Sequence, residues 1–95
     1  NFMAVAILDK SKAKAREELL EMAKAWEKEK GKIQHAIEAY EEVIGSDPES
    51  KEADQARDAI LEIAKRFEKE GKKHSAFFLY HKLAQGQAGL SRRPA

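Results

Sequence analysis

One segment of this chain occurs twice. The sequence LLEMAKAWEKE at residues 19–29 returns as ILEIAKRFEKE at residues 60–70, and a second matched stretch follows each copy, with Tyr40 recurring as Tyr80. A unit this small cannot bury its apolar face alone and must stack on a copy of itself, and arrays of such units usually present binding surfaces. The duplication therefore predicts a helical repeat protein with a binding function.

Apolar residues in both copies recur every three or four positions, which is typical of one face of an α-helix. Four helices are predicted, at residues 12–29, 32–44, 48–70 and 72–85. We expect Gly31, Gly45 and Gly71 to end the first three, because glycine adopts the left-handed conformation of a helix stop at little cost. Asp47 is expected to cap the third helix, with Pro48 in its first turn. The predicted fold class is all-α, two antiparallel helix-turn-helix hairpins.

The domain organisation follows from the two copies. Residues 12–86 form the predicted domain, with repeat 1 at 16–50 and repeat 2 at 57–86. Residues 51–56 are good helix formers and are expected to lengthen the third helix at its start. Residues 1–11 are apolar and are taken as the end of a preceding element, and residues 87–95 are expected to be a flexible tail.

Composition excludes several classes of protein. With 18 Lys and Arg against 17 Asp and Glu, the net charge of +1 disfavours nucleic acid and an anionic membrane as partners. The absence of cysteine excludes disulfides, thiolate metal sites and a cysteine nucleophile. No apolar run approaches membrane-spanning length, so no membrane insertion is expected. The first residue is Asn1, which suggests a piece of a longer protein, and a cytoplasmic location is the default expectation.

The matched positions resemble the signature of the tetratricopeptide repeat family. Unit one carries it with Leu19, Met22, Ala23, Trp26, Gly31, Ala36, Tyr40, Val43 and Pro48. Unit two carries it with Ile60, Ile63, Ala64, Phe67, Gly71, Ala76, Tyr80 and Leu83. The resemblance covers residues 16–86 and implies that these side chains face the core. Three features depart from it: the extra residue Lys30, the lack of a terminal proline in unit two, and the six residues 51–56. A plain four-helix bundle is the alternative.

The resemblance implies that a protein or peptide binds the concave surface formed by the first helix of each hairpin. The candidate groove residues are Leu20, Glu21, Lys24, Lys28, Leu61, Glu62, Lys65 and Lys69. Family members that clamp a C-terminal carboxylate use lysine and asparagine in this groove. No asparagine is present there, so this clamp is not expected. The alternative is that these residues are a solvated face.

A second candidate surface comes from the fourth helix. Residues 77–80 are four large apolar or aromatic residues in a row, and successive helical residues point about 100° apart, so not all can face one core. We expect Phe78 and Leu79 to lie outside the core and to invite a neighbour. The candidate neighbour is the N-terminal segment, in this chain or a second copy, through Phe2, Val5, Ile7 and Leu8. The alternatives are a following repeat or domain and a lone exposed aromatic residue.

Neither catalysis nor a cofactor is predicted. His74 and His81 share a helical face, but two histidines without a third ligand do not form a metal site. Carboxylates alternate with lysines as solubilising pairs do, and none is predicted to lie in a desolvated cleft.

Charge is unevenly distributed along the chain. From Glu38 to Asp54 there are seven acidic residues, whereas Lys10, Lys12, Lys14 and Arg16 come before or at the start of the first copy. In an antiparallel hairpin these two runs should be neighbours, so mutual compensation is the preferred interpretation. The alternative is a basic arm for an acidic partner or nucleic acid.

Overall fold

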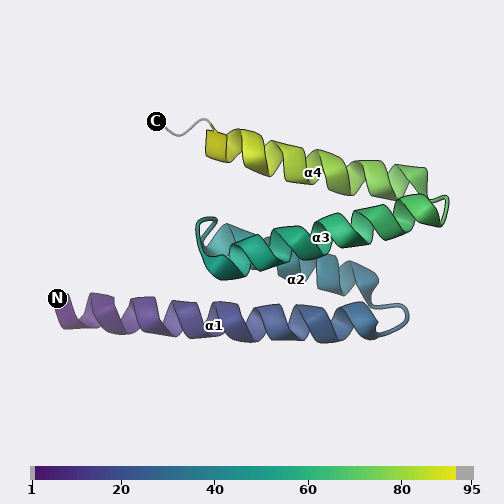
Figure 1. Cartoon of the computed structure of the whole chain (residues 1–95). Helices are drawn as coiled ribbons and strands as arrows, with labels where there is room; N and C mark the ends of the chain where they lie inside the picture. Colours follow the sequence, from purple (N-terminus) through teal and green to yellow (C-terminus); the bar gives the residue numbers. More distant parts are fainter. Residues whose placement is uncertain (1, 92–95) are drawn as a thin grey trace. The chain divides into compact units, whose positions relative to one another are not determined.

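The computed structural model describes the backbone of residues 2–91 and the side chains of residues 10–85. Within that range it contains α-helices and no strand, which confirms the all-α class (Figure 1). The helices are α1 (Phe2–Lys28), α2 (Ile33–Ser46), α3 (Lys51–Lys69) and α4 (Lys73–Ser91). They belong to two compact units, unit 1 (Asn1–Ala56) and unit 2 (Arg57–Ala95), with the boundary inside α3.

Unit 1 is an antiparallel hairpin of α1 and α2 together with the start of α3 (Figure 1). Its buried apolar residues are Leu20, Ala23, Ala36, Ile37, Ala39, Tyr40, Val43, Ala53 and Ala56. Five of these nine are alanines, and small side chains let helix backbones approach closely. Residues 51–56 are helical and Ala53 and Ala56 are fully buried, so the six residues that depart from the repeat signature lengthen α3, as expected.

Unit 2 is the hairpin of the rest of α3 with α4, and these two helices also run in opposite directions (Figure 1). Its buried apolar residues are Ile60, Ile63, Ala64, Ala76 and Leu79. The described part of this unit therefore buries fewer apolar side chains than unit 1.

The two hairpin turns differ because unit 1 has one more residue in its turn. Gly71 has a φ of 84°, the Lys72 amide donates to the Phe67 carbonyl at 2.8 Å, and the Gly71 amide donates to the Glu68 carbonyl at 3.1 Å. This is the Schellman ending of a helix. In unit 1 Gly31 also has a positive φ, of 83°, but the Lys32 amide donates to the Glu29 carbonyl instead. The insertion of Lys30 is thus absorbed in the turn.

Two expected boundaries at the ends of the chain are wrong. α1 begins at Phe2 instead of residue 12, so the segment 1–11 is not a separate element over its described residues. α4 continues to Ser91, so the predicted flexible tail is helical over residues 87–91, and residues 92–95 lie outside the described range. Gln, Ala and Leu are good helix formers, and each glycine costs a helix only about 1 kcal/mol.

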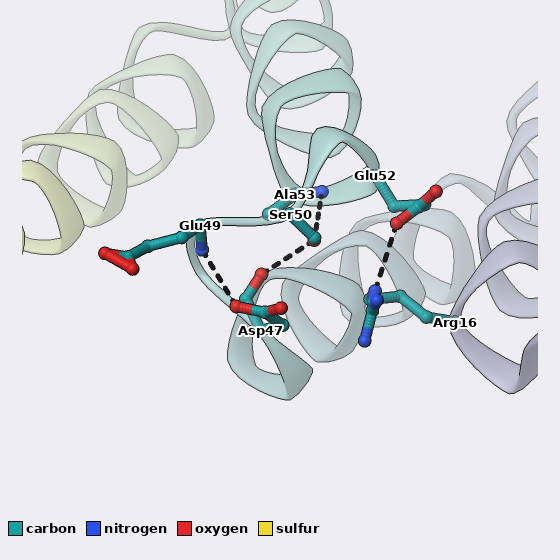
Figure 2. A network of polar contacts seen from close by, with 6 residues as sticks. All are labelled: Arg16, Asp47, Glu49, Ser50, Glu52 and Ala53. Carbon is teal, nitrogen blue, oxygen red and sulfur yellow. Dashed lines mark hydrogen bonds and ion pairs between the residues drawn. The ribbon is translucent and has the colours of Figure 1, made fainter. Parts of the chain in front are cut away.

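The junction between α2 and α3 also differs from expectation. Gly45 does not end α2, which continues to Ser46, and the chain leaves the helix at Asp47, whose extended backbone is favoured before Pro48. Asp47 does not cap α3 either. Its carboxylate accepts from the Glu49 amide at 3.1 Å, while the Ser50 hydroxyl oxygen accepts from the Ala53 amide at 3.1 Å and is the cap of α3 (Figure 2).

Candidate functional site

The exposed face of α1 and α3 carries the same ion pair at matched positions. Lys24 lies 3.4 Å from Glu21, and Lys65 lies 3.6 Å from Glu62, both three residues apart on a helix. The four side chains are between 47% and 69% exposed. Exposed pairs of this kind contribute about 0–1 kcal/mol, so they do little for stability. Their charged groups remain accessible to a partner.

Two more of the predicted binding residues lie at the ends of α1 and α3. Lys28 and Lys69 lie in the last turn of these helices and are exposed. A cation there interacts favourably with the helix dipole. The exposed residues Glu21, Lys24 and Lys28 on α1, and the matching Glu62, Lys65 and Lys69 on α3, are together called the Glu–Lys face below.

The two leucines predicted for the groove do not belong to this face. Leu20 is only 4% exposed and is part of the core of unit 1, and Leu61 is half-buried. Met22, expected in the core, is instead 48% exposed. The expected Leu19, Ala23 and Trp26 do lie on the less exposed side of α1, but that side is centred on positions 13, 16, 20, 23 and 27, alternately three and four residues apart, so it is slightly rotated from the expected one. Two of these positions are charged residues, which apolar periodicity cannot detect.

One of these two charged residues, Glu27, accepts a hydrogen bond that recurs in unit 2. The Tyr40 hydroxyl donates to Glu27 Oε1 at 2.6 Å, and the Tyr80 hydroxyl donates to Glu68 Oε1 at 2.8 Å. Both bonds join the second helix of a hairpin to the last turns of its first helix. Sequence analysis missed this pair, although the Glu that follows Trp26 and Phe67 in both copies was the available signal.

The environment of the two tyrosines is not the same. Tyr40 is 1% exposed, whereas Tyr80 is half-buried. The hydrogen bond to Glu68 raises the pKa of Tyr80 above its usual range, with smaller contributions from partial burial and from the negative charges of Glu68 and Glu62. This phenol therefore loses its proton at a higher pH than an ordinary tyrosine does.

The other charged residue of the α1 stripe, Arg16, pairs with a residue at the start of α3. Its Nε donates to Glu52 Oε1 at 3.1 Å, and the two side chains are only 12% and 7% exposed (Figure 2). Glu52 lies in the first turn of α3, where a carboxylate also interacts favourably with the helix dipole. This contact joins a residue of the basic run to one of the acidic run, as the preferred interpretation of their charges predicts.

The aromatic residues of α4 are arranged differently from the expectation. Phe78 is 56% exposed, as expected, and Phe77 is 69% exposed. Leu79 is 2% exposed and lies in the core, so it is not part of an outer surface. The reason is that the inward stripe of α4 passes through Ala76, Leu79 and Leu83 at spacings of three and four.

Charged and ring groups flank these exposed aromatic side chains. The ring of His81 stacks on Phe77 at 6.0 Å, and the Lys82 ammonium lies 4.7 Å from the centre of the Phe78 ring. The self-association residues proposed from the N-terminal segment, Phe2, Val5, Ile7 and Leu8, lie on α1, but their side chains are outside the described residues.

The described residues hold no cluster of three or more potential metal ligands. His74 and His81 are both exposed, and His35 makes an edge contact with Trp26 at 5.9 Å between ring centres. Among the helices that the structure describes, none is long and apolar enough to cross a membrane.

The chain was compared with known protein families, curated proteins and solved structures. No family model, curated protein or solved structure matches the chain. The resemblance to tetratricopeptide repeats therefore stays an interpretation of the residue pattern.

Proposed function

We propose that this chain is a non-catalytic module that binds a protein or peptide through the Glu–Lys face. The observation that carries the proposal is the recurrence of the pairs Glu21 with Lys24 and Glu62 with Lys65 on exposed helix faces. Because these pairs contribute little to stability, folding alone gives no reason for their presence in both copies. Alternating charges of both signs suit a partner segment that is itself mixed in charge.

The residue pattern adds a second line of support. Two helical hairpins that resemble tetratricopeptide repeats imply binding on the first helix of each repeat, and the Glu–Lys face lies on α1 and α3, the first helices of the two hairpins. Each first helix offers only a few exposed charged groups, which favours a short peptide or a single helix over an extended protein surface.

The test uses charge reversal on this face. A photo-crosslinking side chain placed at Ala25, which is exposed on α1, should capture a discrete partner from an extract of the source cells. Capture should be lost when Lys24 and Lys65 are both changed to Glu, because four of the six charged groups of the face are then acidic and only Lys28 and Lys69 stay positive. The matched control is Glu38→Lys with Glu42→Lys, exposed positions on α2. A partner captured equally by all three proteins would refute the proposal.

Self-association through α4 is the second candidate function. The observation that favours it is the pair of adjacent exposed aromatic side chains, Phe77 and Phe78. Large apolar side chains exposed near one another on a helix commonly mark contact surfaces. The proposed interface is the α4 face of one copy against a second copy.

Sedimentation velocity over a wide concentration range tests this candidate. The unmodified chain should form a concentration-dependent dimer, and Phe78→Glu should abolish it. Met22→Glu, a similar change at an exposed apolar position on α1, should leave the dimer intact. An unmodified chain that is strictly monomeric at high concentration would remove the idea.

A further inference from the structure

Unit 2 has a hollow of about 260 Å³ between α3 and α4. The residues that line it are Arg57, Asp58, Leu61, Tyr80, Leu83 and Ala84. Leu61, Tyr80 and Leu83 are half-buried. The hollow therefore combines apolar side chains with the guanidinium group of Arg57 and the carboxylate of Asp58.

Each lining residue has a counterpart in unit 1 at the repeat offset, which is 41 residues for α3 and 40 for α4. The counterparts are Arg16, Glu17, Leu20, Tyr40, Val43 and Ile44. Leu20, Tyr40 and Val43 are between 0% and 4% exposed. Equivalent side chains are thus buried in unit 1 and partly exposed in unit 2.

In unit 1 the start of α3 is joined to this surface through Arg16. Glu52 pairs with Arg16 at 3.1 Å, Ala53 and Ala56 are fully buried, and Ser50 caps the helix (Figure 2). The sequence that occupies the surface is therefore Glu-Ala-x-x-Ala at a capped helix start. Its alanines allow close approach of the helix, and its glutamate meets the arginine.

We propose that the hollow of unit 2 binds the start of a helix from a partner protein that carries the same pattern, a glutamate followed by alanines as Glu-Ala-x-x-Ala. The carboxylate reaches the guanidinium of Arg57, and the alanines pack on Leu61 and Leu83. Arginine suits this role because its planar group can bind a carboxylate through two parallel hydrogen bonds. The chemistry of the partner is specified by the contact that unit 1 makes with its own α3.

A synthetic peptide of residues 46–60, blocked at both ends, provides the probe. Added to the labelled chain, it should shift the NMR signals of Leu61, Tyr80 and Leu83. A free segment of this length is mostly unfolded and must be ordered on binding, so we expect a Kd on the order of 0.1–1 mM. No shift at millimolar peptide would overturn the proposal. So would shifts centred on Arg16, Leu20 and Tyr40, which would mean that the peptide only replaces the chain's own α3 in unit 1.

Charge exchange makes the test specific. Arg57→Glu should weaken binding about fivefold, and a peptide with Glu52→Arg should restore it, since an ion pair of this kind is worth up to about 1 kcal/mol. Ala84→Trp provides a second variant, because Ala84 is exposed and the indole would fill the hollow and block the peptide. Circular dichroism checks that both variants fold. Unchanged affinity in both would overturn the proposal.

This inference is independent of the proposed function, because the Glu–Lys face does not line the hollow. Changing Lys24 and Lys65 to Glu should leave peptide binding unchanged. The two proposals can therefore fail separately.

Discussion

At the scale of single residues, the ion pair of Arg16 with Glu52 is the contact most sensitive to change. Both groups are nearly enclosed, so removal of one leaves the other charge without its partner in a poorly solvated place. Glu52→Ala should lower the free energy of unfolding by about 3 kcal/mol. Urea unfolding followed by circular dichroism measures the change.

The control for this prediction replaces the pair as a whole. Arg16→Met combined with Glu52→Leu should recover most of the lost stability, since well-packed apolar residues can substitute for a buried ion pair. Glu42→Ala, an exposed position on α2, should change stability by less than about 0.5 kcal/mol. Equal, small losses for Glu52→Ala and Glu42→Ala would contradict the importance of the pair.

Tyr80 gives a prediction on pH. Because Glu68 raises the pKa of this phenol, the folded state holds the proton more tightly than the unfolded state, whose pKa is about 10. The resulting stabilisation is fully present below about pH 10 and is lost as the pH rises through the higher pKa of the folded state. The ¹³Cζ signal of Tyr80 should therefore titrate above pH 10, and in Glu68→Gln it should titrate at a lower pH. An unchanged midpoint in that variant would show that Glu68 is not the cause.

At the scale of elements, two glycines should respond to alanine in opposite ways. Gly71 has a positive φ, which a side chain tolerates poorly, so Gly71→Ala should destabilise the chain by about 1 kcal/mol. Gly45 lies within α2, outside the positive-φ region, and an added Cβ would meet no atom within 4 Å. Gly45→Ala should therefore stabilise by about 0.5–1 kcal/mol. Thermal unfolding of both variants decides the signs, and a loss of stability in Gly45→Ala would contradict the helical role of this residue.

The same elements show how far the sequence could predict the structure. Apolar spacing and the turn glycines sufficed for four helices and for the turns at Gly31 and Gly71. They failed at Gly45 and at the end of α4, because a glycine ends a helix only where the following chain and its contacts also favour the stop. The rotation of α1 could not be predicted either, since Arg16 and Glu27 face inward to make polar contacts that apolar periodicity does not report.

The candidate sites were predictable to a different degree. The exposed lysines and glutamates of the Glu–Lys face follow from the repeat pattern, but Leu20 and Leu79 were assigned to surfaces and lie in the core. Successive residues of an α-helix point about 100° apart. A predicted stripe that is shifted by one position therefore moves a side chain from the core to the surface or the reverse. The hollow of unit 2 could not be predicted from the sequence. It becomes apparent only when the exposed fractions of side chains at matched positions are compared, and a sequence does not give exposed fractions.

At the scale of the whole molecule, the two units are unequal in their buried cores. Tyr40 and Val43 of unit 1 are at most 1% exposed, whereas Tyr80 and Leu83, at the matched positions of unit 2, are half-buried, and buried apolar area is the main stabilising contribution. Regions with fewer buried contacts open at lower free energy. We therefore expect α4 to open locally while α2 remains folded.

Native-state hydrogen exchange measures this difference residue by residue. The amides of Ala39 and Tyr40 in α2 should exchange more slowly than those of Leu79 and Tyr80 at the matched positions of α4, by at least about tenfold, which corresponds to 1.4 kcal/mol. Leu79→Ala should accelerate exchange in α4 and leave α2 nearly unchanged, because the lost core contact belongs to unit 2. Equal acceleration in both helices would instead show that the two units open together. Unit 2 would then not open at a lower free energy than unit 1.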